Sequence, residues 1–392
     1  MLPASRGVTT PCHATTFVLV AADRLRRQFL FSFLIALVAC SPAPTRAAPC
    51  NRLASLKLPN TTITSARVIP AGGFRMPVSR RPPSVEIFTA FDRLPPFCRV
   101  QAVISPSRDS HIETEVWLPV TGWNGRFLGV GNGGYAGSIG YSRLGEAVNS
   151  GYATSGTDTG HKGDSRDSRW ANGHPEKQTD FDYRAIHEMT MLAKAAIDSF
   201  YGKPPNRSYF SACSNGGRQG LMEAERYPTD YDGIMAGAPA YRYGFHTFVS
   251  GQLDAFRDRG GKLVIYHGSA DAPDGSVDYY QRLAARMGKQ RADTFVRLYI
   301  VPGMGHCGSG EAPNDFGQWI RPTATPQSSM LRALETWVEG GAAPEGIVAT
   351  QWRRDGDTSS GVLRTRPICP YPRQARWSGS GNRDEASNYS CN

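Results

Sequence analysis

Four features are missing from this sequence: an apolar run of membrane-spanning length, a clustered basic patch, a Cys-x-x-Cys pair and an internal repeat. The apolar run Phe29–Ala39 is too short to cross a bilayer. The net charge is +10, but residues 1–48 hold five arginines and one aspartate, which leaves a dispersed excess of about +6 on the rest. A dispersed positive charge does not indicate nucleic-acid binding. It is typical of a surface that keeps a protein soluble or that lies near acidic polysaccharide.

The first 48 residues are expected to be a leader. Three arginines precede the run Phe29–Ala39, as in a secretory signal peptide, and cleavage is expected after Ala47 or Ala48. The stretch Leu37–Cys40 also resembles a bacterial lipoprotein signal, which would acylate Cys40 and place the protein at a membrane. We therefore expect a secreted or periplasmic protein, with membrane contact only in a form lipidated at Cys40.

Residues 49–392 are expected to form a single α/β domain. No linker rich in Pro, Gly or Ser divides them, and about 340 residues are enough for one large core. Apolar strand-like runs alternate with helical ones, which predicts a mostly parallel sheet flanked by helices. Strands are expected at 126–130, 207–211, 233–236, 262–268 and 295–301, and helices at 181–201, 217–227, 276–287 and 327–339.

The cysteines indicate an oxidising compartment. Cys12 and Cys40 lie in the leader, and an even number remains. Six cysteines allow fifteen pairings, so the spacing alone does not select one. Free thiols or a zinc site are the alternatives, although the absence of Cys-x-x-Cys argues against zinc. The remaining cysteines are Cys50, Cys98, Cys213, Cys307, Cys369 and Cys391.

Two of these cysteines each adjoin a residue suited to hydrolytic chemistry. Cys213 directly precedes Ser214, and Cys307 directly follows His306. The two cysteines are 94 positions apart in the sequence. A disulfide requires Cα atoms about 4.4 to 6.8 Å apart, so a Cys213–Cys307 bridge would bring Ser214 beside His306. Because a serine nucleophile needs an adjacent base and imidazole is the usual one, the pair forms a candidate catalytic dyad.

The surroundings of Ser214 predict a nucleophile elbow. A strand at 207–211 leads into the turn Ala212–Gly216 and then into the helix at 217–227. This order matches Gly-x-Ser-x-Gly, with Ala212 in place of the first glycine, and it aims the N–H of Asn215 at a developing oxyanion. The alternative is that Ser214 only caps the helix that follows.

Asp271 is the expected third member of a triad. Hydrolases of this type run Ser, then Asp or Glu, then His, and Asp271 follows the strand at 262–268 at the edge where ligands bind. Its role would be to orient His306 and to stabilise the imidazolium. Asp274 and Asp278 are rivals, and Asp271 could instead cap the helix that begins near Ser276.

The glycine-rich stretch Gly129–Gly134 matches Gly-x-Gly-x-x-Gly after a strand. A dinucleotide site would require a helix to follow, whereas the sequence continues as a glycine-rich loop to Gly140. The loop after an early strand supplies the second oxyanion N–H in α/β-hydrolases. We expect Gly133 to be that donor, with Gly134 as the alternative, because glycine allows the backbone to approach the substrate closely.

With these residues in place, the chain resembles the tannase and feruloyl esterase family, which includes mono(2-hydroxyethyl) terephthalate hydrolases. The resemblance rests on Cys213-Ser214, Asp271 and His306-Cys307 and covers nearly everything from Cys50 onward. Further matching motifs are Glu115–Pro119, Trp123–Phe127, Gly131–Gly134, Gly151–Ala153, Asp158–His161, Gly237–Pro239, Gly260–Leu263 and Arg366–Tyr371.

The resemblance implies a fold, an activity and a disulfide pattern. It implies an α/β-hydrolase and a serine carboxylesterase that acts on esters of aromatic acids, such as hydroxycinnamates or gallates, free or attached to plant polysaccharide. It implies that Ser214, Asp271 and His306 are catalytic and that no cofactor is needed. It also selects three pairs: Cys50 with Cys98, Cys213 with Cys307, and Cys369 with Cys391.

One departure from the family is large. Members carry a long lid domain, with a structural calcium ion and much of the aromatic-substrate pocket, between the strand after the elbow and the strand that bears the acid. Here only 22 residues, 240–261, occupy this place, so neither the lid nor its calcium is expected. A lid supplies binding energy and excludes water. The alternative function is therefore a lidless member that binds phenolic or cell-wall ligands without turnover.

Overall fold

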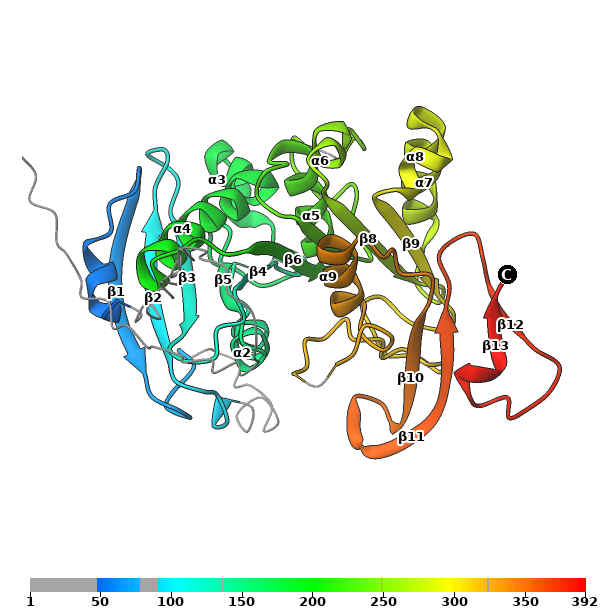
Figure 1. Cartoon of the computed structure of the whole chain (residues 1–392). Coiled ribbons are helices and arrows are strands. Elements are labelled where there is room, and N and C mark those ends of the chain that lie inside the picture. Colours follow the sequence, from blue (N-terminus) through cyan, green and yellow to red (C-terminus); the bar gives the residue numbers. More distant parts are fainter. Residues whose placement is uncertain (1–47, 78–90, 136, 248, 323) are drawn as a thin grey trace, which may run out of the picture. The chain divides into compact units, whose positions relative to one another are not determined.

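The computed structural model describes residues 48–77, 91–135, 137–247, 249–322 and 324–392. The expected leader, with Cys12 and Cys40, lies outside the described residues except for its last residue, Ala48. A sheet of nine strands forms the centre of the domain (Figure 1). Its strands are β1 (Thr61–Ile69), β2 (Phe97–Ile104), β3 (Ile112–Pro119), β4 (Arg126–Val130), β5 (Ala153–Thr157), β6 (Arg207–Cys213), β7 (Gly233–Gly237), β8 (Lys262–Gly268) and β9 (Val296–Val301).

The strand order is β1-β2-β3-β5-β4-β6-β7-β8-β9. Strands β1, β2, β3 and β5 pair antiparallel, whereas β5, β4, β6, β7, β8 and β9 all pair parallel. The parallel half is the part that the alternation of strands and helices predicted. Since parallel strands place their carboxyl ends at one edge, the residues that follow β4, β6 and β8 meet there.

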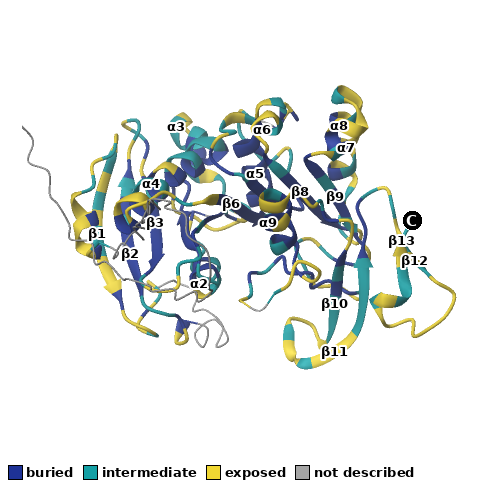
Figure 2. Cartoon of the chain, in the orientation of Figure 1, coloured by how far each residue is buried: buried dark blue, intermediate teal, exposed yellow. Residues whose placement is uncertain are grey.

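Helices cover both faces of the parallel strands. On β8, Leu263 and Ile265 pack into one apolar cluster, and Val264 and Tyr266 pack into another on the opposite face. Both sets are buried, which explains why the strand reads as a continuous apolar run (Figure 2). The helices are α2 (Tyr141–Asn149), α3 (Pro175–Thr179), α4 (Ala185–Tyr201), α5 (Asn215–Arg226), α6 (Asp254–Asp258), α7 (Asp274–Met287), α8 (Lys289–Asp293) and α9 (Met330–Gly340).

Several helix boundaries differ from the sequence prediction. The predicted helix at 181–201 begins with a π-helical stretch, Asp180–Arg184, before α4. Helix α5 starts at Asn215 instead of 217, because the N–H of Arg218 already bonds to the carbonyl of Ser214. Helix α7 starts two residues before the predicted 276. Helix α9 starts three residues after the predicted 327, since the Ser329 hydroxyl caps it.

The chain ends in two small antiparallel sheets. Strands β10 (Ile347–Arg354) and β11 (Asp357–Ile368) form one hairpin, and β12 (Ala375–Trp377) pairs with β13 (Tyr389–Cys391). Three disulfides join the same pairs that the family resemblance implied: Cys50–Cys98, Cys213–Cys307 and Cys369–Cys391. Among the residues that the structure describes, no helix is long and apolar enough to cross a membrane.

Candidate active site

Ser214 stands on a tight turn between β6 and α5. Its backbone has φ 65° and ψ −125°, a region that costs a residue with a side chain about 1–3 kcal/mol. The N–H of Ser214 donates to the carbonyl of Gly237 at 2.8 Å, and its own carbonyl accepts from the N–H groups of Arg218 and Ala240, both at 3.1 Å. These contacts hold the turn in place and leave the hydroxyl above the end of β6.

The glycines after Ser214 are required by close packing. A Cβ on Gly216 would lie 2.5 Å from the Cβ of Ala212, and a Cβ on Gly217 would lie 2.3 Å from the carbonyl oxygen of Gly237. Ala212 stands where the usual motif has glycine, and its methyl group is accommodated because Gly216 has none. The Gly-x-Ser-x-Gly geometry is therefore retained with alanine at its first position.

Ser214, His306 and Asp271 form a continuous hydrogen-bonded chain. The Ser214 hydroxyl lies 2.8 Å from His306 Nε2, and His306 Nδ1 lies 2.5 Å from Asp271 Oδ2. The Cys213–Cys307 disulfide joins the neighbours of Ser214 and His306, with Cα atoms 6.0 Å apart. The structure thus brings together the three residues that the sequence singled out, from the ends of β6 and β8 and from the loop after β9.

The rival carboxylates lie elsewhere. Asp274 is the first residue of α7, and Asp278 forms an ion pair with Arg282 on the same helix. Asp271 is not a helix cap either, because Pro273 holds that position. Although partial burial acts in the opposite direction, hydrogen bonds from His306 and His267 keep the pKa of Asp271 below its usual value. Asp271 is therefore ionised at neutral pH and can stabilise an imidazolium.

His267 is a neighbour of the triad that the sequence reasoning missed. Its Nε2 lies 2.9 Å from Asp271 Oδ2, and its Nδ1 lies 2.7 Å from the Ser276 hydroxyl. Burial lowers the pKa of His267, while the hydrogen bond to Asp271 acts against that effect. The available signal was the spacing: a histidine at the end of a buried strand, four residues before the candidate acid.

The two expected oxyanion donors lie in segments that contact helix α5 or belong to it. Asn215 is the first residue of α5, where backbone N–H groups have no partner within the helix. Its side-chain oxygen accepts from Arg218 Nε at 2.7 Å, which fixes the side chain at the start of the helix. Asn132, just before Gly133, donates its N–H to Gln219 at 3.0 Å, which ties this loop to α5.

Gly133 and Gly134 differ in their environment. Gly133 is exposed, and a Cβ there would meet no atom within 4 Å. Gly134 has φ +58°, and a Cβ there would lie 2.3 Å from the carbonyl oxygen of Ser165. Gly134 therefore has a packing reason to be glycine, whereas Gly133 faces open space. The next α-helix begins only at Tyr141, which does not fit a dinucleotide fingerprint.

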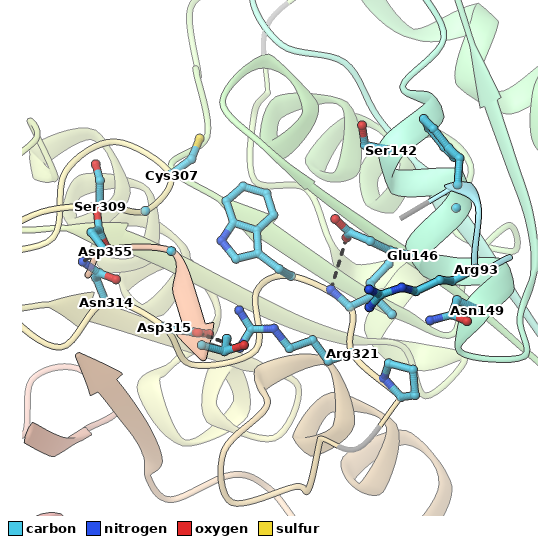
Figure 3. Close-up of a pocket in the computed structure, with 18 of the residues that line it drawn as sticks. Arg93, Ser142, Glu146, Asn149, Cys307, Ser309, Asn314, Asp315, Arg321 and Asp355 are labelled. Carbon is cyan, nitrogen blue, oxygen red and sulfur yellow. Dashed lines mark hydrogen bonds and ion pairs between the residues drawn. The ribbon is translucent and has the colours of Figure 1, made fainter. Parts of the chain in front are cut away.

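A cleft of about 1000 Å³ opens beside His306 and Cys307. In Figure 3, Ser309 and Asn314 lie at one side of it, and Arg93 and Glu146 lie at the other. The lining mixes aromatic and aliphatic surface with charged groups, and the sequence reasoning did not predict it. Its apolar members are Phe91, Leu94, Trp319, Ile320 and Pro322, and its charged members are Arg93, Glu146, Asp315, Arg321 and Asp355, besides His306.

The short connection after β7 packs beside the elbow. The carboxylate of Asp182 accepts the N–H groups of Phe245, His246 and Thr247 at 2.8, 2.9 and 3.1 Å. Tyr243 stacks on Tyr135, with ring centroids 4.2 Å apart, in the loop that follows Gly133. Hydrogen bonds and several aromatic contacts, among them those of Phe245 with Trp170 and Phe181, thus fasten this segment to the core of the domain.

Two groups of three histidines and carboxylates offer ligand atoms within 4.8 Å of one another in the described part of the chain. One contains His267, Asp271 and His306, described above. The other contains His187, Glu223 and Asp230.

In the second group, burial and the nearby charge of Asp230 raise the pKa of Glu223 well above its usual value. A protonated Glu223 can donate to Asp230, which also accepts from His187 Nδ1 at 2.7 Å. A shared proton therefore accounts for this cluster without a metal ion.

Comparisons with known proteins identify the family of this chain. A family model described as "Tannase and feruloyl esterase" matches residues 98–255 and 248–392. An uncharacterised esterase of Xanthomonas campestris is 28% identical, over 93% of this chain and 94% of that protein. Feruloyl esterase B of Aspergillus niger is 25% identical, over 91% of this chain and 97% of that protein.

Solved structures show the same fold. A crystal structure of an esterase from Aspergillus oryzae has a TM-score of 0.77 at 23% identity, covering 87% of this chain and 99% of the other. Feruloyl esterase B from the same organism has a TM-score of 0.76 at 22% identity, with the same coverage. The family model spans most of the chain, and the fold is that of the α/β-hydrolases. This chain therefore belongs to the tannase and feruloyl esterase family of carboxylesterases.

Proposed function

We propose that this protein hydrolyses carboxylic esters of aromatic acids through an acyl-enzyme intermediate on Ser214. The observation that carries the proposal is the unbroken hydrogen-bonded chain from the Ser214 hydroxyl through His306 to the Asp271 carboxylate. A serine becomes nucleophilic when an adjacent base takes its proton, and this base is in turn oriented by a carboxylate.

The geometry supports the following sequence of steps. Ser214 Oγ attacks the ester carbonyl while His306 Nε2 takes the hydroxyl proton, and the backbone N–H groups of Asn215 and Gly133 stabilise the oxyanion. His306 then gives the proton to the departing alcohol. A water molecule, activated by the same imidazole, attacks the acyl-enzyme and releases the acid. Throughout, Asp271 holds His306 in the tautomer that leaves Nε2 facing Ser214.

The aromatic character of the substrate rests on the family and on the cleft. The relative from Aspergillus niger bears the name feruloyl esterase, and a solved relative is called a tannin acyl hydrolase. In this chain the half-buried Trp319 lines the cleft next to His306 and offers surface for a phenolic ring. The alcohol portion, including plant polysaccharide, is left to experiment.

We further propose that the chain lacks the family's lid. The alignment with the Xanthomonas relative runs over 554 positions, more than the 392 residues of this chain, so the relative carries a long stretch that has no counterpart here. The family model matches in two segments that meet near residue 250, inside the 240–261 connection. A lidless site would be open to water, which favours small or loosely held esters.

Export fits the three disulfides. Disulfides persist in oxidising compartments, and bridges in a chain of this size are typical of secreted or periplasmic proteins. We propose such a location for this protein. Lipidation at Cys40 remains the alternative that would place it at a membrane.

The test compares the mature protein with a Ser214→Ala variant on p-nitrophenyl acetate and methyl ferulate. We expect the variant to lose at least about 10³-fold in kcat, because it lacks the nucleophile. A Ser55→Ala variant, at an exposed position on the first turn of the domain, serves as the control for handling and should match the wild type. Equal rates for wild type and Ser214→Ala would favour the binding protein without turnover.

A further inference from the structure

His267 joins the triad to the core of the domain. It is the penultimate residue of β8, and only 5% of its surface is exposed. Asp271 Oδ2 lies within hydrogen-bond distance of two imidazoles. His306 Nδ1 is 2.5 Å away, and His267 Nε2 is 2.9 Å away. On the far side of the ring, Nδ1 of His267 lies 2.7 Å from the hydroxyl of the fully buried Ser276, and that hydroxyl accepts from Tyr241 at 3.1 Å.

The chemistry of the partners determines the direction of every bond in this chain. An ionised Asp271 can only accept, so His267 must carry its proton on Nε2. A neutral ring then leaves Nδ1 as an acceptor, and the Ser276 hydroxyl donates to it while accepting from Tyr241. Burial favours the neutral ring. His267 thus has one tautomer in which all its hydrogen bonds are satisfied.

We propose that His267 is a positioning residue, which holds the Asp271 carboxylate in the orientation that His306 requires. This inference rests on the proposed esterase function. Asp271 lies on a turn after β8, and about a third of its side chain is exposed, so it is not immobilised by packing. The buried imidazole supplies a rigid donor from the strand itself.

The hydrogen-bonded chain also reaches the short connection at 240–261. Tyr241 belongs to that connection, and its ring packs 5.1 Å from the ring of Tyr279 on α7. The residue before it, Ala240, donates its N–H to the carbonyl of Ser214. One segment therefore contacts the nucleophile through its backbone and the acid through Ser276 and His267.

Two substitutions at position 267 separate positioning from core packing. The amide nitrogen of His267→Gln can reach the place of Nε2 and keep the donation to Asp271. In His267→Asn the shorter side chain reaches only the place of Nδ1, next to Ser276. Both remove the ring from the same buried site, but Asn is one methylene shorter and leaves the larger cavity, so the pH profile is needed beside stability to isolate the hydrogen bond to Asp271.

We expect His267→Asn to lower kcat on p-nitrophenyl acetate about ten-fold with little change in KM, and His267→Gln to recover most of that loss. The acid limb of kcat/KM should move to higher pH in the Asn variant, because Asp271 loses a donor and attracts the proton on His306 more strongly. A role in core packing alone would lower the melting temperature of both variants, more so for Asn, and would leave that limb in place.

Equal kcat for the two variants, or an unmoved acid limb in the Asn variant, would overturn the inference. If His267→Asn does not fold, ¹⁵N NMR of the wild type decides: a neutral Nε2–H ring for His267 between pH 6 and 8 supports the inference, and an Nδ1–H ring or an imidazolium overturns it. Failure of the esterase proposal would appear separately, as equal rates of wild type and Ser214→Ala.

Discussion

Glu223 shows how one buried carboxyl group shapes the pH dependence of stability. It lies on α5 with no exposed surface, next to Asp230. Burial favours the neutral form, and the charge of Asp230 adds to that preference. Since its folded-state pKa lies above the unfolded value, its contribution to stability is complete below about pH 4.3 and is lost as the pH rises toward the folded-state pKa.

We therefore predict that the stability of a Glu223→Gln variant, relative to the wild type, increases as the pH rises. Below about pH 4 both proteins carry a neutral group at this position and should unfold alike. Above it, the difference in free energy of unfolding should grow by up to about 1.4 kcal/mol per pH unit until the folded-state pKa is reached. Urea unfolding from pH 4 to 8 measures this, with the exposed Glu311→Gln as the control for a lost charge. A constant difference across that range would show that Glu223 is ionised in the folded protein.

At the scale of the element, the strand–turn–helix unit of β6 and α5 matters most. The turn is held by backbone hydrogen bonds to Gly237 and Ala240, and it closes only because Gly216 presents no side chain to Ala212. These hydrogen bonds and this packing therefore maintain the strained backbone of Ser214. The position of the Ser214 hydroxyl depends on them.

A Gly216→Ala substitution tests this fit. The added methyl group would lie 2.5 Å from Ala212 Cβ and 2.9 Å from the carbonyl oxygen of Asn132, so we expect a loss of about 1–3 kcal/mol in stability. Because Asn132 adjoins Gly133, hydrolysis of p-nitrophenyl acetate should fall as well. Gly340→Ala is the matched control, because a Cβ at this position at the end of α9 meets nothing within 4 Å. It should keep both its stability and its esterase activity. A Gly216→Ala protein as stable and active as the control would contradict the packing argument.

At the scale of the whole molecule, three disulfides connect distant parts of the chain. The Cys213–Cys307 bridge closes a separation of 94 residues, and Cys369–Cys391 closes one of 22. In the chain-entropy treatment these bridges contribute up to about 4.7 and 3.4 kcal/mol, respectively. Of these bridges, only Cys213–Cys307 lies next to Ser214 and His306.

Replacing both cysteines of each bridge by serine separates stability from catalysis. We expect both double variants to unfold at lower urea concentration, the Cys213–Cys307 variant by the larger margin. Only that variant should also lose ester hydrolysis at temperatures where it remains folded, because the loop of His306 is no longer held at the elbow. The Cys369–Cys391 variant is the matched control. Full activity in the folded Cys213–Cys307 variant would show that the loop keeps its place without the bridge.

Much of the fold followed from local patterns. Runs such as 262–268 are buried on both faces, so they stay apolar without alternation, and glycines after Ser214 mark a turn that no other residue allows. The antiparallel strands β1 to β3 were not predicted, because the choice of pairing partner leaves little trace in the sequence of either strand. The cleft residues Arg93, Trp319 and Arg321 were missed for the same reason, since they come from separate loops.

The sequence by itself predicted the elbow, a candidate triad with rival acids, and an oxidising compartment, because the elbow depends on neighbours along the chain and the compartment on residue type. Only the tertiary structure decided that Asp271, rather than Asp274 or Asp278, contacts His306, and that His267 and Ser276 support it. Which carboxylate reaches an imidazole depends on where a strand ends and a helix begins, to within one residue. A hydrogen bond is sensitive to displacements of less than 1 Å, and sequence patterns do not specify positions that finely.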